Sequence, residues 1–376
     1  MEFFISTSDI QRAIKLLNVT AKMNVTSFEG QIFIKTGEDN VTFTSRNNNS
    51  GLSCVVPAKI ITPGKFNVLY SRMKSFIMTF NPWDGEFGAK EFHFKVNHPK
   101  LKVNVEIFYE NGNSSKSNLN LDYIKESAFL TPETVEKPNL ILNSSIMKSA
   151  IDKALYAIDP QGTEKFTKGL RMVLKDGLIS FTATNGVVVS DYKVANESGL
   201  EEGEYFLPYE FLMGLRRILM DDLQLFFDIS KQKIKISFDD VLFWSNSLSY
   251  DRWPATDSVW GNFDKTVELK REILLSGMSS FIDVLDSDDF NRVTVGMKEK
   301  QLFLETDSSL FEYPVLDEDL EFLIDISGKD LINSLNAISD DDIKLKCLDS
   351  KNGLILESSG FDNQKAFITN LILKRR

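Results

Sequence analysis

The residues of this chain that could do chemistry are mostly carboxylates gathered in short acidic runs. Such runs occur at positions 221–222, 239–240, 286–289 and 340–342. Closely spaced carboxylates hold Mg²⁺ in two-metal nucleases, so a metal-dependent nuclease is one hypothesis. Each run, however, stands where a helix is expected to end or a strand to turn, and acidic residues are common in solvated turns. We therefore favour a structural role for these carboxylates.

Other catalytic residues are scarce. The chain has two histidines, His93 and His98, in one expected hairpin, and two cysteines, Cys54 and Cys347, too few for a disulfide framework. Beyond that hairpin no histidine or cysteine pair has zinc-site spacing, and there is no Gly-Lys-Ser/Thr phosphate loop or Gly-Xaa-Ser-Xaa-Gly elbow. The sequence thus predicts a protein that is not an enzyme, needs no metal or cofactor, and suits a reducing cytoplasm.

The distribution of charged residues indicates binding of DNA rather than catalysis. With 43 basic and 54 acidic residues the net charge is −11, so the chain as a whole would be repelled by DNA. Lysine and arginine nevertheless recur on the polar faces of the predicted helices. On one helix an ordinary solvated face explains this better, but the bias recurs on five helices and predicts a local basic surface. The residues expected to face DNA from these helices are Arg12, Lys15, Lys22, Arg72, Lys148, Lys153, Arg216 and Arg217.

The elements that must position these residues occur three times. Residues 1–22 show an alternating apolar strand with Phe3 and Ile5, a cap cluster, and a helix with Ile10 and Ala13 on one face. The same apolar pattern returns 137 and 264 positions later. A period this long means that each copy is a domain, because solenoid repeats are much shorter.

Each copy reads strand, helix, several strands, helix, several strands. The second helices are predicted at 66–77, 209–219 and 329–338. This order predicts an α+β fold of three similar domains, each with two helices packed on an antiparallel sheet. We place the domains at 1–130, 131–262 and 263–376, each large enough to bury its own core. No apolar run could span a membrane and residues 1–20 are not a signal peptide, so we expect no membrane association.

Three stretches carry a family resemblance. The stretch 181–189 (FTATNGVVV) is similar to the Ala-Thr-Asp-Gly-His-Arg-Leu run of bacterial sliding clamps, the beta subunits of DNA polymerase III. The stretch 250–259 (YDRWPATDSV) resembles the proline-bearing segment before the last domain of that family, and 366–373 (AFITNLIL) resembles its final strand. Their order and spacing extend the resemblance over essentially the whole chain.

The resemblance implies a DNA-clamp fold in which one chain forms half of a ring. Two chains would close head to tail around duplex DNA, without sequence-specific contacts. The protein would be a processivity factor that tethers a replicative polymerase, hydrolyses nothing, and is loaded by a separate ATPase in the cytoplasm. Encirclement also explains how an acidic protein can stay on DNA, because retention then needs no strong contact.

The resemblance also assigns site residues. DNA-facing loop positions match Gln161, Lys165 and Phe166, where Phe166 replaces a tyrosine of the family. The dimer interface would pair an edge strand near Leu101 and Val103 with Val284 and Leu285 of the last domain. The pocket for polymerase and loader peptides would comprise Thr167, Thr184, Gly186, Val187, Val188, Val189, Pro254, Val259, Ile368, Asn370 and Ile372.

The pocket departs from the family pattern. Val187 and Val188 replace a histidine and an arginine, and Asn370 replaces a methionine, so we expect the preferred peptide motif to differ from the usual one. The same residues would also suit strands that simply pack a domain junction. A structural virion or assembly protein made of duplicated domains is the other alternative. The many Asn, Lys and Phe residues suit either a bacteriophage or an AT-rich bacterium.

Overall fold

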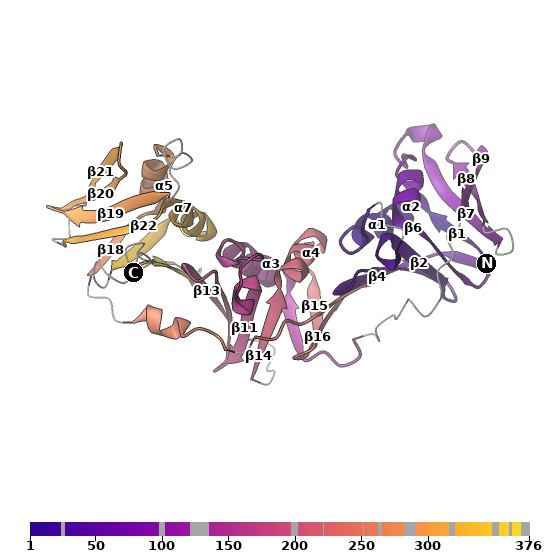
Figure 1. Cartoon of the computed structure of the whole chain (residues 1–376). Helices are drawn as coiled ribbons and strands as arrows, with labels where there is room; N and C mark the ends of the chain where they lie inside the picture. Colours follow the sequence, from indigo (N-terminus) through magenta and orange to yellow (C-terminus); the bar gives the residue numbers. More distant parts are fainter. Residues whose placement is uncertain are drawn as a thin grey trace. The chain divides into compact units, whose positions relative to one another are not determined.

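The computed structural model describes residues 1–23, 27–97, 102–120, 135–196, 202–220, 222–250, 252–261, 265–281, 291–315, 320–347, 353–360 and 363–369 (Figure 1). The chain forms two compact units. The first comprises residues 1–144 and 213–246, and the second comprises residues 145–212 and 247–376. The stretch 131–262 therefore contributes to both units.

The order of elements repeats three times, as predicted. The first repeat consists of β1 (Glu2–Ser6), α1 (Thr7–Leu17), β2 (Gln31–Thr36), β3 (Asn40–Arg46), β4 (Ser50–Pro57), β5 (Lys59–Thr62), β6 (Lys65–Leu69), α2 (Tyr70–Ile77), β7 (Ala89–Asn97), β8 (Lys102–Tyr109) and β9 (Ser114–Asn120). The second consists of β10 (Leu140–Asn143), α3 (Ser144–Ala154), β11 (Gly169–Lys175), β12 (Leu178–Thr184), β13 (Val188–Ala195), β14 (Gly203–Pro208), α4 (Tyr209–Ile218), β15 (Gln224–Ile229), β16 (Lys233–Phe238) and β17 (Val241–Asn246).

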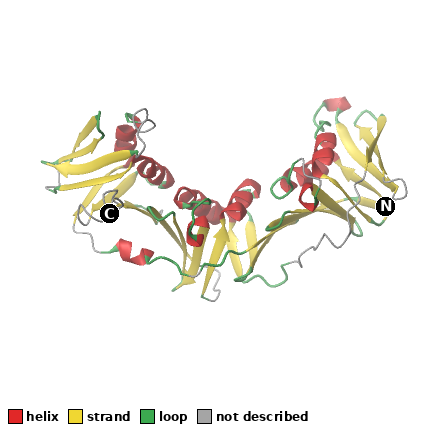
Figure 2. Ribbon diagram, in the orientation of Figure 1, coloured by secondary structure: helices red, strands yellow, loops and turns green. Residues whose placement is uncertain are grey.

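The third repeat consists of β18 (Lys265–Lys270), α5 (Arg271–Ser279), β19 (Arg292–Lys298), β20 (Gln301–Glu305), β21 (Leu310–Pro314), β22 (Phe322–Ser327), α7 (Gly328–Ala337), β23 (Asp342–Cys347), β24 (Gly353–Ser358) and β25 (Gln364–Thr369). Only the first repeat has an additional strand, β5, among the described residues. Figure 2 shows the helices and strands of each unit.

Local signals explain the helix starts. The Ser6 side chain caps α1 by accepting a hydrogen bond from the backbone N–H of Asp9 at 3.1 Å, and Ser327 caps α7 by accepting from Asp330 N–H at 3.2 Å. The apolar stripe of α1, including Ile10 and Ile14, is fully buried. Burial of that stripe against β4 and β7, rather than intrinsic helix propensity, stabilises this short helix.

Each repeat divides its strands between two sheets. Four of the strands between the two helices form what we call the front set, and the first strand with the three strands after the second helix forms the rear set, which in the first repeat also includes β5. The front set of the first repeat joins the rear set of the second through β4 and β17, which pair antiparallel from Cys54 and Val241 onward. The front set of the second joins the rear set of the third through β13 and β25. We call these two junctions the first seam and the second seam.

The seams leave two sets unjoined. The rear set of the first repeat ends at the edge strand β9, in a sheet of order β5-β1-β7-β8-β9. The front set of the third repeat ends at the edge strand β21, in a sheet of order β21-β20-β19-β22. Within the described part of the chain, each of these strands has a neighbour on one side only. Such edges present unpaired backbone groups to a further strand.

Candidate partner and DNA interfaces

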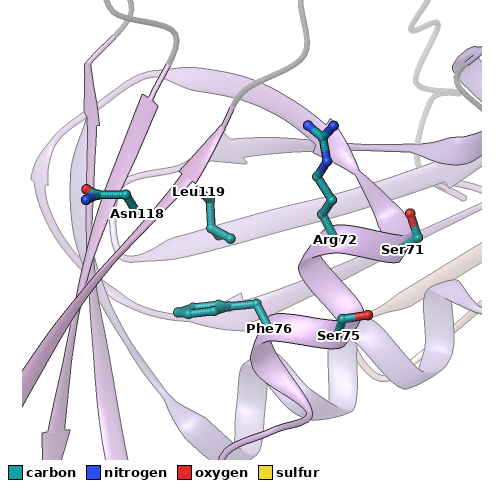
Figure 3. A pocket seen from close by; sticks show the side chains of 6 residues that line it. All are labelled: Ser71, Arg72, Ser75, Phe76, Asn118 and Leu119. Carbon is teal, nitrogen blue, oxygen red and sulfur yellow. The ribbon is translucent and has the colours of Figure 1, made fainter.

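A groove of about 570 Å³ lies between helix α2 and edge strand β9. Phe76 and Leu119 extend into the space between the helix and the strand (Figure 3). The Phe76 ring is anchored by edge-on contacts with Phe80 and Phe92, at centroid distances of 5.3 and 6.2 Å. An apolar floor with a polar rim suits an apolar side chain from a neighbouring segment. The lining residues are Ser71, Arg72, Ser75, Phe76, Asn118 and Leu119.

At the first seam, the corresponding place between α4 and β17 is occupied by the chain that follows α1. A Cβ added at Gly214 of α4 would come within 2.7 Å of Val19 and within 2.9 Å of Phe243 on β17. Val19 and Phe243 both lie against α4 at Gly214, so the chain after α1 packs beside this helix near the last strand of the rear set. The absence of a side chain at Gly214 makes the room for it.

The second seam repeats this arrangement. The segment that follows α3, η5 (Leu155–Ala157), contacts α7. Burial raises the pKa of the Tyr156 hydroxyl. Ser334 of α7 and Gln364 of β25 lie close enough to this hydroxyl to oppose the rise, which places Tyr156 near both elements. At both seams, then, the chain after the first helix of one repeat lies between the second helix and the last strand of the next. The groove beside β9 has the same position in the first repeat.

This geometry corrects the predicted dimer contact. Val103 is fully buried on β8, which has β7 on one side and β9 on the other, so it does not lie on an edge strand. Its partner in the outer strand is Leu119. The edge strand β9 was missed because its sequence, SSKSNLN, lacks apolar alternation. Leu101, Val284 and Leu285 lie outside the described residues.

Several of the residues predicted to form the peptide pocket lie at or next to the second seam, on β12, β13 and β25. The turn from β12 to β13 holds Gly186 at a φ of +86°, which favours glycine. The Asn185 side chain accepts hydrogen bonds from the N–H groups of Val187 and Val188, both at 2.9 Å. The Thr184 hydroxyl donates to the Val188 carbonyl at 2.7 Å and accepts from Gly186 N–H at 3.1 Å. The turn is therefore fixed by its own side chains.

Opposite faces of the seam strands have different environments. Val188 and Ile368, which are direct partners across the seam, are fully buried. Val189 pairs with Phe367, and Phe367 pairs with Ile355 on β24, so these three share the other face. They form an apolar cluster against which Val259 and Trp260 pack. The structure thus brings together two predicted residues, Val189 and Val259, with three that the sequence analysis missed.

The segment around Pro254 is held against β14 by aromatic and charged side chains. The Trp253 ring lies edge-on to Phe166 at 6.2 Å and to Phe206 at 6.1 Å. The Arg171 guanidinium lies 5.2 Å from the Trp253 ring, and its Nε donates to Glu204 at 2.9 Å. Tyr250 also donates to Glu204, and burial together with that carboxylate raises the pKa of Tyr250 to about 12.

The other predicted pocket residues are less directly connected. The nearly buried Thr167 hydroxyl donates to the Glu164 carbonyl at 2.8 Å and serves the local turn. The Pro254 carbonyl accepts from Thr256 N–H at 2.7 Å. Thr369, next to Ile368, donates from its N–H to the Val187 carbonyl at 3.0 Å. Asn370 and Ile372 lie outside the described residues.

Two of the predicted DNA-facing residues are committed to other contacts. The Arg12 guanidinium forms a bidentate ion pair with Asp240 in the β16–β17 turn, in which Nη1 donates to Oδ2 at 2.8 Å and Nη2 donates to Oδ1. These hydrogen bonds raise the pKa of Arg12. Lys153 is only 5% exposed, and its ammonium donates to the Ala337 carbonyl at 3.3 Å and to Ser339 at 3.1 Å. A cation there stabilises the C-terminal end of α7. The prediction that Lys153 faces DNA is therefore wrong.

The remaining predicted residues differ in exposure. Lys22 is exposed and forms an ion pair with Glu29 at 3.0 Å. Phe166 and Lys148 are half-buried, and Phe166 packs on Trp253. The side chains that stand exposed on α1, α2, α4 and the loop before β11 are Lys15, Arg72, Gln161, Lys165, Arg216 and Arg217.

The acidic runs do not converge in the part of the chain that the structure describes. Asp240 is bound by Arg12, and Asp340 accepts from Ser358 and from Gly360 N–H at 3.0 Å. Among the described residues no group of three or more His, Cys, Asp or Glu side chains could hold a metal ion. Asp221 and the run at 286–289 lie outside them. None of the described helices is both long and apolar enough to cross a membrane.

Comparison with solved structures identifies the fold. The chain is similar to the beta subunit from DNA polymerase of Streptococcus pyogenes, with a TM-score of 0.86, 17% identity, and coverage of 99% of this chain and 100% of that one. It is also similar to the DNA polymerase III subunit beta from Pseudomonas aeruginosa, with a TM-score of 0.87, 15% identity, and coverage of 99% and 100%. The DNA polymerase sliding clamp from Bacillus subtilis gives a TM-score of 0.86 at 15% identity, with 99% of each chain covered.

No protein-family model and no curated protein matches the sequence. The fold that the resemblance implied is nevertheless confirmed. The chain has the sliding-clamp fold over almost its entire length.

Proposed function

We propose that this protein is a DNA sliding clamp. It would encircle duplex DNA and tether a replicative polymerase, hydrolyse nothing, be loaded by a separate ATPase, and act in the cytoplasm. The observation that carries the proposal is the similarity in fold to DNA polymerase beta subunits over 99% of the chain. The threefold order of elements supports the predicted division into domains at 1–130, 131–262 and 263–376.

The way in which the repeats already join supports ring closure by a second copy of the chain. At each internal seam the outer strand of one front set, β4 or β13, pairs with the last strand of the next rear set, β17 or β25. The same kind of pairing would join β21 of one chain to β9 of a second copy. In a closed ring of two copies, both edge strands of each chain would then be paired. A stable closure of this kind needs roughly 1,000 Å² or more of buried surface.

The groove beside β9 supplies the second part of the closing contact. At the internal seams the chain that follows α1 or α3 lies in the corresponding place. In the ring, the chain that follows α5 of the second copy would lie there, which is the segment that holds Val284 and Leu285. Their apolar side chains suit the floor formed by Phe76 and Leu119.

Binding of DNA would use diffuse contacts. The exposed cations on α1, α2 and α4 and in the loop before β11 would meet phosphates without reading bases. Partner peptides would bind over the second seam, beside Val189 and Val259, where apolar side chains from several strands gather. Val187, which is half-buried in the turn before β13, stands where the family pattern has a histidine.

Retention on circular DNA tests the proposal. The purified protein, loaded onto nicked circular DNA, should stay bound and should run off after that DNA is cut to a linear form. Equal retention on both forms would reject encirclement.

A second experiment tests the partner surface. Val259→Glu should weaken binding of the cognate polymerase, because it places a charge on the apolar cluster, while Leu178→Glu at an exposed position should not. Unaltered polymerase binding by the folded Val259 variant would remove the pocket assignment but leave the ring intact.

A further inference from the structure

The most exposed large apolar side chains in the described part of the chain are Trp83 and Phe87, at 85% and 74% exposure. Both belong to the loop between α2 and β7. The Asn81 side chain accepts from Trp83 N–H at 3.0 Å and donates to Asp84 at 2.9 Å, and Gly85 has a φ of +58°. These hydrogen bonds order the loop while both aromatic rings remain exposed to solvent. The two rings therefore do not contribute to the hydrophobic core.

This loop is joined to the end of the edge strand. The N–H of Glu110 donates to the Gly88 carbonyl, and the N–H of Asn111 donates to the Glu86 carbonyl, both at 3.0 Å. Glu110 and Asn111 form the turn between β8 and β9. The two rings therefore stand beside the turn that leads into the proposed ring-closing strand.

At the first seam, the equivalent turn touches the first helix of the adjoining repeat. That turn, between β16 and β17, carries Asp240, which binds Arg12 of α1. Helix α5 has the position of α1 in the third repeat, and the residue 264 positions after Arg12 is Ser276. Serine cannot form this ion pair. At the proposed closing contact between two copies, the equivalent of the Arg12–Asp240 ion pair would therefore be missing.

We propose that Trp83 and Phe87 pack on helix α5 of a second copy, over Ser276 and the half-buried Leu275, and so replace the ion pair by an aromatic clasp. The inference rests on the proposed ring. Small serine side chains at Ser276 and Ser279, both exposed, leave room for two rings to lie flat on the helix. Each buried ring removes a large apolar area from water, whereas a partly exposed ion pair such as Arg12–Asp240 contributes about fivefold or less to an equilibrium constant.

Sedimentation equilibrium of the full chain measures the effect. The double variant Trp83→Ala/Phe87→Ala should raise the dimer dissociation constant roughly tenfold or more, as expected for a buried aromatic contact. The matched control Leu178→Ala/Met220→Ala removes two exposed apolar side chains elsewhere and should leave it unchanged. A dissociation constant equal to that of the unaltered chain would overturn the clasp.

Chemical cross-linking checks the location. The variant Asp84→Cys/Ser276→Cys, treated with a short bismaleimide, should give a covalent dimer, because the native cysteines are buried. The control Asp84→Cys/Glu210→Cys, with an exposed position on α4, should not. A dimer that forms normally but gives no cross-link and no change in affinity removes the clasp alone. A chain that stays monomeric at all concentrations removes the proposed ring and the clasp together.

Discussion

The two internal seams have the same backbone arrangement but different side-chain chemistry. Both pair the outer strand of a front set with the last strand of a rear set. At the first seam the polar contact is the Arg12–Asp240 ion pair, in which the two side chains are 36% and 25% exposed. At the second seam it is the buried ammonium of Lys153, set on the C-terminal end of α7.

The difference indicates that strand pairing and apolar filling define a seam, while its polar contacts are replaceable. Backbone pairing needs no particular side chains, so the seam can recur between repeats that share little sequence. The polar contacts then determine how much the free energy of unfolding falls when one of their side chains is removed. The loss of stability should be larger for a buried contact, because water screens the charges of an exposed ion pair but cannot reach a buried charge.

The largest effect is expected from removing the apolar filling of the first seam. Phe243→Ala deletes a ring that is 1% exposed and touches Gly214, next to Val19. It should lower the free energy of unfolding by about 3–5 kcal/mol, the usual cost of a large cavity. Urea denaturation followed by circular dichroism measures this loss. Leu242→Ala, at a half-buried position on the same strand, is the control and should cost much less.

A smaller loss is expected at the second seam when its buried cation is replaced by an apolar isostere. Lys153→Met leaves the Ala337 carbonyl and the Ser339 hydroxyl without this donor. The exposed Ser339 can bind water instead, so the expected loss of about 1–3 kcal/mol in the same urea experiment comes mainly from the charged hydrogen bond to the Ala337 carbonyl. Lys165→Met at an exposed position should be neutral. A neutral Lys153 variant would mean that the ammonium is dispensable to the seam.

The corresponding change at the first seam should cost less. Arg12→Met removes an ion pair that water partly screens, so the loss should be about 1 kcal/mol or below. Lys15→Met, exposed on the same helix, is the control. If Arg12→Met proved more costly than Lys153→Met, burial would not be what distinguishes the two seams.

These contacts mark the limit of what the sequence could predict. The apolar stripe at Ile10 and Ile14, the Ser6 cap and the long repeat period are local or periodic signals, and they led to the correct elements. The role of Arg12 depends on a carboxylate 228 residues away, and that of Lys153 on a carbonyl 184 residues away. A basic residue on a polar face looks the same whether it meets solvent, DNA or a distant partner. Only the folded chain separates these cases.

The smallest effect concerns acid stability near the second seam. Burial disfavours the ionised form of Glu357, but hydrogen bonds from Lys346 and Lys365 outweigh it and lower the pKa of this carboxyl below 4.5. A group whose pKa is lower in the folded state stabilises the fold above its unfolded pKa, and this contribution is lost as the pH falls through the folded value. Glu357→Gln should therefore reduce stability by a few tenths of a kcal/mol at pH 7, after screening, and less at pH 3. Urea midpoints at the two pH values measure the difference, with Glu268→Gln on β18, whose side chain is 70% exposed, as the control. An equal loss at both pH values would mean that the two lysines do not act on Glu357 through its charge.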